Sequence, residues 1–313
     1  MKILVTGAAG FIGSHLTRRL AALGFSIRGV DCFLDDSYPS SIKRANYKDL
    51  SALNFPNLEL VHADLRFDDL DLVLDGIDAV INLAAMPGLM KSWSNFKLYN
   101  SCNVDAVYRL LSNDNYSAKL FLQASTSSVY GRVVDGDESF NCVPTSPYGV
   151  TKLAAENLLE AFHQNFDIQY TCLRYFSVYG PGQRPDMGYS IFINKIINGE
   201  VIHIYGDGNA SRVNTYIDDC VELTMQAVMH PAINRAVNIS GKTEITVNES
   251  IRIIEEILGK KAIVEYVEKR PGDQIRTFNS SNLAEQLFRV RSEVKPDEGL
   301  EKQIQHQLRE STL

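Results

Sequence analysis

This chain of 313 residues has no long apolar run, no excess of positive charge and few cysteines. No segment approaches the roughly 18 consecutive apolar residues that a membrane-spanning helix needs. The formal net charge is -7, which argues against a basic surface for nucleic acid or an anionic membrane. The first segment, MKILVTGAAGFIG, is too short and too rich in glycine for a signal peptide. We therefore expect a protein that binds neither nucleic acid nor membranes.

Cysteine and histidine are also sparse. The five cysteines are scattered and odd in number, which is typical of a reduced chain in the cytoplasm. Neither they nor the six histidines show the spacing of a metal site. We expect a cytoplasmic protein without a bound metal.

The chain does contain a regular alternation of apolar, strand-like segments with helix-like segments. Helices are predicted at 14–24, 96–113 and 147–165. Buried strands are predicted at 2–6, 26–31, 58–64, 77–85, 119–125 and 168–175. This alternation predicts parallel βαβ units, and hence an α/β fold with a Rossmann-type, doubly wound parallel sheet.

The sequence changes character at about residue 176, where loops with glycine and proline become frequent. We predict a first domain over residues 1–175 and a smaller C-terminal α/β lobe, facing the substrate, over residues 176–313. The segment 236–240 (AVNIS) is expected to return to the first domain as a strand, so the boundary is interleaved.

The segment TGAAGFIG follows the first strand and opens the first helix. Gly7 would allow the tight turn, Gly10 would let the backbone approach a pyrophosphate at the helix N-terminus, and Gly13 would let helix and strand pack closely. Phe11 and Ile12 lie between these glycines and are expected to contact the same ligand. The pattern predicts a dinucleotide site, with a purely structural turn as the alternative.

Asp31 ends the second strand, where a carboxylate can accept hydrogen bonds from both hydroxyls of an adenosine ribose. It would repel a 2′-phosphate, so we favour NAD over NADP, and the first domain is expected to bind NAD. The other expected cofactor contacts follow the third strand, near the adenine, and the fourth strand, near the nicotinamide ribose: Asp64, Leu65, Leu83, Ala84 and Ala85.

Tyr148 and Lys152 are four residues apart in a helix that starts near Pro147, so their side chains share one face. A phenol has an unperturbed pKa near 10, and a nearby ammonium favours the phenolate. The pair is therefore suited to accept a proton from an alcohol while hydride passes to NAD. A surface tyrosine–lysine pair without a function is the alternative.

Seven segments occur in this order from residue 6 to residue 273: TGAAGFIGSHL, NLAA, ASTSSVYG, SPYGVTK, LRYFSVYGPGQRPDM, GDGNASRVNTYIDD and RPGD. Together they resemble the NAD-dependent nucleotide-sugar epimerase/dehydratase family of extended short-chain dehydrogenase/reductases, and most closely its UDP-glucuronate and UDP-glucose 4-epimerases. The resemblance implies that Thr126 is catalytic and binds the sugar O4, that Tyr148 takes the proton, and that Lys152 orients Tyr148 and the ribose.

The residues after Thr126 separate the members of this family. The related dehydratases and decarboxylases carry an acid close to this position, whereas this chain has Ser127 and Ser128. The resemblance therefore favours epimerisation at C4 through a 4-keto sugar. A dehydratase, decarboxylase or reductase of the same family is the alternative. A non-catalytic NAD-sensing protein is more distant, because Tyr148 and Lys152 are both present.

The resemblance also implies where a UDP-sugar would bind. Arg212 and Arg270 match positions that clamp the diphosphate, although Val213 replaces the acid that usually follows the first arginine. Ser127, Ser128, Ser177 and Arg184 are expected to hold a C6 carboxylate, which slightly favours UDP-glucuronate over UDP-glucose or UDP-galactose. Alternatively, Arg184 binds only phosphate or an acid within its own loop.

A homodimer built on the helices around 96–113 and 147–165 is a further implication of the resemblance. The apolar positions that are compatible with it are equally compatible with packing on the sheet: Val107, Leu110, Leu111, Leu158, Leu159 and Phe162.

Overall fold

A computed structural model describes residues 1–231, 233–270 and 272–310. Pro271 of the RPGD segment and the last three residues of the 176–313 lobe lie outside these ranges.

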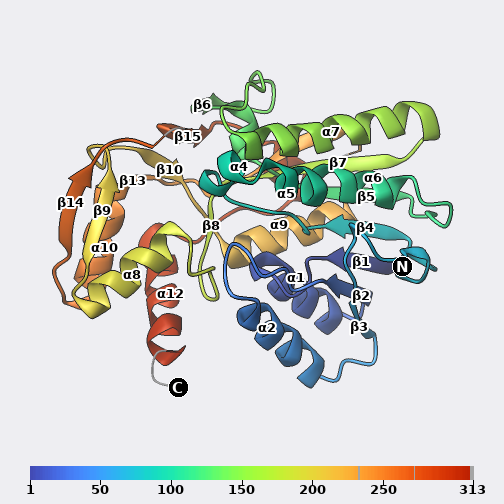
Figure 1. The fold of residues 1–313 in the computed structure, drawn as a ribbon, viewed down its shortest axis with the longest axis horizontal. Coiled ribbons are helices and arrows are strands. Elements are labelled where there is room, and N and C mark those ends of the chain that lie inside the picture. The colour runs from blue at the N-terminus through green and yellow to red at the C-terminus, as the bar shows by residue number, and fades with distance from the viewer. Residues whose placement is uncertain (232, 271, 311–313) are drawn as a thin grey trace.

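The centre of the described structure is a parallel sheet in the order β12-β7-β5-β4-β1-β2-β3 (Figure 1). Every predicted strand is present, with ends that differ by at most three residues. The observed bounds are β1 (Lys2–Thr6), β2 (Ser26–Asp31), β3 (Leu58–His62), β4 (Ala79–Asn82), β5 (Leu120–Thr126), β7 (Gln169–Tyr175) and β12 (Arg235–Ile239). The doubly wound α/β prediction is confirmed, as is the return of the 236–240 segment, because β12 pairs with β7.

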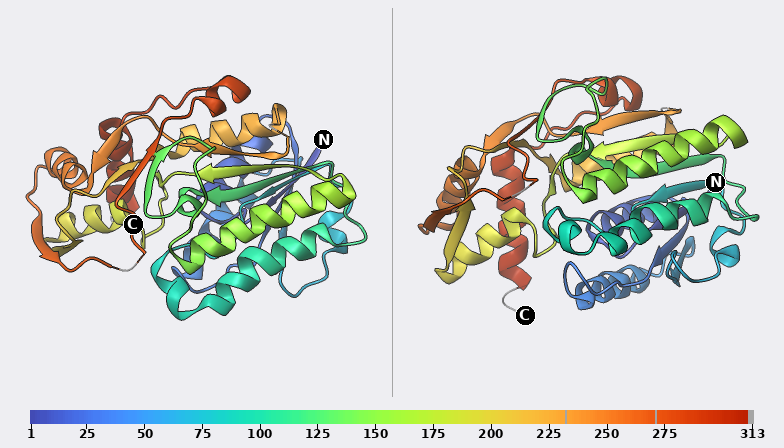
Figure 2. Two further views of the ribbon diagram at one scale, coloured as in Figure 1. Left: turned by 90° about the horizontal axis from the view of Figure 1, so that it is seen from above. Right: turned by 45° about the horizontal axis from the view of Figure 1, so that its top comes forward.

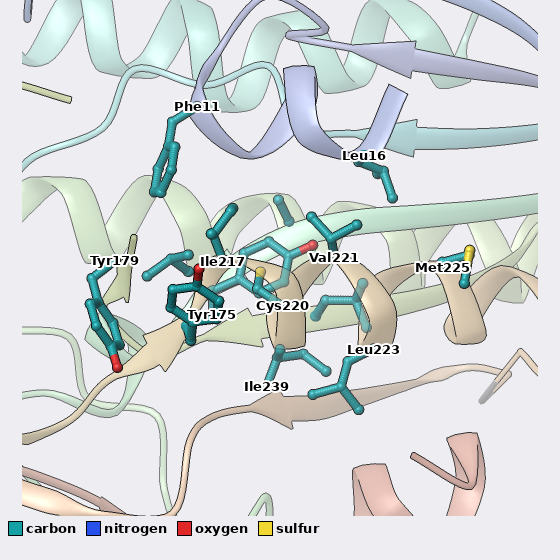
Figure 3. Packing of buried hydrophobic residues seen from close by; sticks show 14 of the residues in the cluster. Phe11, Leu16, Tyr175, Tyr179, Ile217, Cys220, Val221, Leu223, Met225 and Ile239 are labelled. Carbon is teal, nitrogen blue, oxygen red and sulfur yellow. The ribbon is translucent and has the colours of Figure 1, made fainter. Parts of the chain in front are cut away.

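Helices cover both faces of this sheet. On one face, α1 (Phe11–Ala22) packs against α9 (Ile217–Met229), with α2 (Ser40–Ala52) beside α1 and α11 (Leu283–Phe288) beside α9. Figure 3 shows side chains of α1 and α9 facing each other, among them Phe11, Leu16, Ile217 and Val221. The other face carries α3 (Asp71–Leu74), α6 (Ala106–Leu111) and α7 (Pro147–Phe166) (Figure 2). Successive buried side chains of β1 point to opposite faces of the sheet: Ile3 packs with the core on the α1 and α9 side, and Leu4 packs with the core on the α6 and α7 side.

Two predicted helices differ in detail from the structure. The first begins at Phe11 rather than Ser14, because Gly10 has an extended backbone and caps it. The expected helix over 96–113 consists of α5 (Phe96–Asn100), one π-helical turn (Ser101–Asp105) and α6. A short helix, α4 (Met90–Ser94), precedes it.

The smaller lobe is formed mainly by residues after β7, on the left in Figure 1. Its strands pair as β9 with β14 and β8 with β11, and they form a mixed sheet in the order β13-β10-β15-β6. To this sheet β6 comes from the segment that precedes α7. The division at residues 175 and 176 stays a prediction. The remaining bounds are β6 (Val133–Gly136), β8 (Val178–Tyr179), α8 (Gly188–Asn198), β9 (Val201–Tyr205), β10 (Ser211–Val213), β11 (Thr215–Tyr216), β13 (Glu244–Thr246), α10 (Val247–Leu258), β14 (Ile263–Val267), β15 (Arg276–Asn279) and α12 (Pro296–Glu310).

Within the described ranges, every helix is too short or too polar to cross a bilayer.

Candidate active site

A cavity of about 680 Å³ opens at the carboxyl ends of β1, β4 and β5. In a doubly wound sheet this is the edge where ligands bind, and the strand order reverses here between β1 and β4. The cavity is lined by all the residues that the sequence predicts for the site: Gly7, Gly10, Phe11, Ile12, Gly13, Asp31, Asp64, Leu65, Leu83, Ala84, Ala85, Thr126, Ser127, Ser128, Tyr148, Lys152, Ser177, Arg184, Arg212 and Arg270. Their individual roles stay predictions.

The glycine turn packs so closely against the backbone around it that two of its positions leave no room for a side chain. Gly7 has a φ of +66°, and a Cβ there would lie 2.9 Å from the backbone nitrogen of Ala84. A Cβ on Gly13 would overlap the carbonyl oxygen of Gly7. Among the residues that the structure describes, no side chain caps α1, and no acid lies in its first turn. Its free N–H groups are therefore available to an anion. This cradle fits the pyrophosphate of a dinucleotide.

The carboxylate of Asp31 is held in place by two backbone N–H groups, one for each of its oxygens. Its Oδ2 accepts a hydrogen bond from the Ala9 N–H at 3.0 Å, and its Oδ1 accepts one from the Phe33 N–H at 2.8 Å. Burial raises the pKa of this carboxyl, and the two backbone hydrogen bonds and the charge of Lys43 oppose that rise. A fixed carboxylate here is arranged to accept the hydroxyls of a ribose.

Asp64, by contrast, is already paired. Its two carboxylate oxygens accept hydrogen bonds from Arg66, from Nε at 2.9 Å and from Nη2 at 2.6 Å. The side chain that was expected to lie near the adenine is therefore part of a local ion pair.

The loop after β4 is held by Asn103 of the π-helical turn. Its Oδ1 accepts from the Met86 N–H at 2.7 Å, while its Nδ2 donates to the Met86 carbonyl at 3.1 Å and to Thr151 Oγ1 at 3.0 Å. The Ala84 N–H donates to Thr6 Oγ1 at 3.1 Å. These bonds join the wall of the cavity to β1 and to α7.

Thr126 and Tyr148 meet at the floor of the cavity. Thr126 ends β5, and its Oγ1 accepts a hydrogen bond from the Ser128 N–H at 3.2 Å at the start of a 3-10 turn (Ser127–Tyr130). Ser146 caps α7 by accepting from the Gly149 N–H at 3.1 Å, and Pro147 fits its first position. This start places Tyr148 in the first turn of α7, within hydrogen-bonding reach of Thr126.

Burial governs the electrostatics of the tyrosine–lysine pair. It raises the pKa of the Tyr148 phenol, and the hydrogen bond with Thr126 and the charge of Arg184 oppose the rise. Burial also lowers the pKa of Lys152 to about 8, against the attraction of Glu156 and Cys172. Lys152 is 2% exposed, and none of the described residues accepts a hydrogen bond from its ammonium. A buried donor of this kind fits the hydroxyls of a nicotinamide ribose.

Arg184 and Asp186 face each other across their own loop. Arg184 Nε donates to Asp186 Oδ1 at 2.9 Å and Nη2 donates to Oδ2 at 2.7 Å. The guanidinium also lies over the Tyr38 ring, 5.5 Å from its centroid. Arg184 therefore pairs with an acid within its own loop, and its role toward a substrate stays a prediction. Ser177 is exposed on the wall of the same cavity.

The two remaining arginines approach the cavity from the smaller lobe. Arg212, on β10, donates to the Ser211 carbonyl at 2.8 Å and to the Gln274 carbonyl, and burial lowers its pKa. Arg270 Nε donates to Asp273 Oδ2 at 3.0 Å, and its guanidinium lies 4.0 Å from the centroid of the Tyr205 ring.

Several lining residues were not predicted from the sequence. Gln274 follows the RPGD segment and donates to the carbonyls of Ser127 and Gly131, at 3.3 and 2.9 Å. Tyr38 and Lys43 reach the cavity from the loop and helix after β2. Only Asp186 had a signal in the sequence, namely its position two residues after Arg184 in the RPD segment.

Comparison with known proteins agrees with this geometry. Residues 3–240 match the model of the NAD dependent epimerase/dehydratase family. The uncharacterised UDP-glucose epimerase YtcB of Bacillus subtilis is 39% identical over 309 residues, which cover 97% of each chain. A UDP-glucuronate 4-epimerase of Thermodesulfobacterium geofontis is 34% identical, with 96% of this chain and 94% of that protein covered.

A solved structure is also similar over almost the whole chain. It is the UDP-glucuronic acid 4-epimerase of Bacillus cereus in complex with UDP-glucuronic acid and NAD, with a TM-score of 0.94, 36% identity and 99% of each chain covered. The chain therefore belongs to the NAD dependent epimerase/dehydratase family, and NAD is its cofactor.

Proposed function

We propose that this protein inverts C4 of a UDP-sugar through a transient 4-keto intermediate, with UDP-glucuronate slightly favoured over UDP-glucose or UDP-galactose. The observation that carries this proposal is the hydroxyl-rich segment of Thr126, Ser127 and Ser128, which lines the cavity beside Tyr148. The similarity to a UDP-glucuronic acid 4-epimerase at 36% identity supports it.

In this mechanism Thr126 donates a hydrogen bond to the sugar O4, and Tyr148 accepts the proton of the C4 hydroxyl as hydride leaves C4. The Lys152 ammonium binds the ribose hydroxyls and favours the phenolate form of Tyr148. Bound NAD supplies a hydride acceptor that is restored within each catalytic cycle. The 4-keto sugar then turns over in the cavity, and Tyr148 returns the proton after hydride adds to the other face of C4.

The same segment argues against elimination. A 4,6-dehydration needs an acid to protonate the leaving hydroxyl and a base at C5. Ser127 and Ser128 occupy the positions after Thr126, and both are buried side chains without a carboxylate. Short hydroxyls can hydrogen-bond a sugar in two orientations, as an epimerase requires.

A neutral hexose is the second candidate for the substrate, and the ion pair of Arg184 with Asp186 favours it. A guanidinium whose Nε and Nη2 already donate to one carboxylate has less capacity for a second. Binding of a uronate then requires either the remaining nitrogen of Arg184 or displacement of Asp186.

The test is to supply UDP-glucuronate and UDP-glucose separately, with no added NAD, and to follow C4 stereochemistry by NMR. We expect both epimers to appear, and faster for the uronate. Faster conversion of the neutral sugar would mean that UDP-glucose, and not UDP-glucuronate, is the preferred substrate. Accumulation of a 4-keto product, or loss of carbon dioxide, would identify a dehydratase or a decarboxylase instead.

We also propose a homodimer that uses the outer faces of α6 and α7. Of the six apolar positions considered, Val107, Leu110, Leu111 and Leu159 are buried within the chain's own core. Leu158 and Phe162 are only partly buried. Exposed aromatic rings lie near them, at Tyr108 and Phe166, so an apolar face is available to a second copy.

A further inference from the structure

The catalytic helix α7 carries a third polar residue in line with Tyr148 and Lys152. Glu156 lies four residues after Lys152, so the three side chains follow one face of the helix. Glu156 is buried, although a glutamate is rarely buried without a partner. The proposed chemistry does not use it, and its surroundings explain why it is there.

Both oxygens of the Glu156 carboxylate are engaged. Arg174 on β7 donates from Nε to Oε1 at 3.1 Å and from Nη2 to Oε2 at 2.7 Å, and Ser125 Oγ donates to Oε1. Each side chain of the Glu156–Arg174 pair is 8% exposed. Removing one partner of such a pair would leave the other charge buried and uncompensated.

The hydrogen bonds continue beyond Arg174 to Tyr130, the last residue of the 3-10 turn. Arg174 Nη1 donates to Tyr130 Oη at 2.8 Å, and Tyr130 Oη donates to Asn238 Oδ1 at 2.7 Å. The guanidinium also lies 4.8 Å from the centroid of the Tyr130 ring. Because Ser125 precedes Thr126 and Tyr130 follows it by four residues, this network holds the Thr126 segment on both sides.

We propose that Glu156 is a positioning residue for the cofactor site: with Arg174 it holds α7 against the Thr126 segment, and its negative charge keeps the Lys152 ammonium charged for the NAD ribose. This goes beyond the proposed epimerisation, because it concerns NAD binding whatever sugar is converted.

The electrostatics of Lys152 agree with this arrangement. The charges that raise the pKa of Lys152 are those of Glu156 on the same helix and Cys172 on β7. Tyr148 lies one turn earlier on α7, and burial raises the pKa of its phenol, which favours the neutral form. Burial raises the pKa of the Cys172 thiol well above its usual range, so the thiol is neutral. Among the described residues, Glu156 is then the remaining source of negative charge near Lys152, and it opposes the burial that lowers the pKa of Lys152 to about 8.

Glu156→Gln should change the pH dependence of NAD binding. Without the carboxylate, the pKa of Lys152 falls further, and the ammonium loses its proton at a lower pH. NAD affinity, which is expected to fall as pH rises through this pKa, should therefore begin to fall at a lower pH in Glu156→Gln than in the wild type. Between these two pH values the variant should bind NAD more weakly than the wild type.

The experiment is to measure the NAD dissociation constant by titration calorimetry from about pH 6 to about pH 10, a range that contains the pKa of about 8. Glu156→Asp keeps the negative charge, so its NAD affinity should begin to fall at nearly the same pH as that of the wild type. Glu160→Gln is a matched control, because Glu160 lies one turn further along α7 and accepts from Tyr170 Oη at 2.6 Å. It should leave the profile unchanged.

A folded Glu156→Gln protein with the wild-type profile overturns the proposal, as does a wild-type affinity that does not vary with pH. If Glu156→Gln does not fold, the double variant Glu156→Gln/Arg174→Met decides, because it also removes the unpaired cation. We expect the double variant to melt near the wild-type temperature and to lose NAD affinity at a lower pH than the wild type. Loss of affinity at the same pH as in the wild type would overturn the proposal. A protein that binds NAD but converts no UDP-sugar would refute the proposed function and leave this test valid.

Discussion

Arg184 and Asp186 form a two-point ion pair inside the cavity, with Nε–Oδ1 at 2.9 Å and Nη2–Oδ2 at 2.7 Å. An uronate substrate would bring a second carboxylate to the same guanidinium, whereas a neutral hexose would leave the pair intact. If Arg184 binds the sugar as proposed, we expect Asp186 to influence the choice between these sugars.

Replacing Asp186 with asparagine should shift specificity toward UDP-glucuronate. Hydrogen bonds to charged groups contribute about 1.5–3 kcal/mol, so the ratio of kcat/KM for UDP-glucuronate to that for UDP-glucose should rise about tenfold or more. Steady-state kinetics on both sugars measure it. Asp135→Asn is the matched control, because Asp135 pairs with Arg276 at 2.7 Å without lining the cavity. An unchanged ratio in the Asp186 variant would show that the pair does not affect sugar choice.

Tyr148→Phe removes the phenol that is expected to accept the C4 proton. General acid–base groups contribute about 10²–10⁴-fold to rate, so kcat should fall by that factor while NAD affinity changes little, because Lys152 is retained. NMR of C4 stereochemistry gives the rate, and calorimetry gives the affinity. Tyr266→Phe is the control, because Tyr266 is exposed on β14, away from the cavity. Full turnover by Tyr148→Phe would refute the mechanism.

Asp31→Asn should weaken NAD binding and reduce discrimination against NADP. The carboxylate is held by the N–H groups of Ala9 and Phe33, and an amide can replace only part of this acceptor capacity. We expect about a ten- to hundredfold loss of NAD affinity, from hydrogen bonds to a charged group. Fluorescence titration with NAD and NADP measures both. Equal loss for the two cofactors would mean that Asp31 does not read the 2′ position.

Much of the fold could be predicted from local sequence. Buried strands such as KILVT are continuous apolar runs, and Gly7 and Gly13 sit where only glycine fits, in the turn after β1 and in the first turn of α1. The residues of the candidate site could be named because they follow strands whose carboxyl ends meet at one edge. The start of α1 was missed by three residues, since its cap is a glycine backbone rather than a side chain that marks it.

The parts that were missed depend on contacts between distant segments. Nothing near Glu156 in the sequence identifies Arg174 as its partner, because the pairing requires α7 to lie on β7. Tyr38 lines the cavity from the loop between β2 and α2, and no local motif of the sequence marks it. Likewise, the helix pattern alone could not separate Leu159, which is buried in the core, from Leu158, which is partly exposed.

Leu158→Glu tests the proposed dimer face. A charge at a partly exposed position should cost little in the folded monomer but should be costly in an apolar interface. We expect the wild type to sediment as a dimer and the variant as a monomer with nearly the same melting temperature. Sedimentation velocity distinguishes these states. A variant that remains dimeric would place the interface elsewhere.

Gly13→Ala tests whether close packing of the glycine turn on α1 is essential. The added Cβ would overlap the Gly7 carbonyl oxygen, so α1 must move away from β1 and the pyrophosphate cradle must widen. Overpacking of this kind costs about 1–3 kcal/mol, and we expect a lower melting temperature together with weaker NAD binding. Gly188→Ala is the control, since a Cβ there has its nearest neighbour, an atom of Phe192, 4.0 Å away. If Gly13→Ala lowered stability but left NAD affinity intact, the turn would serve folding alone, and the cofactor would depend on Asp31 and Lys152.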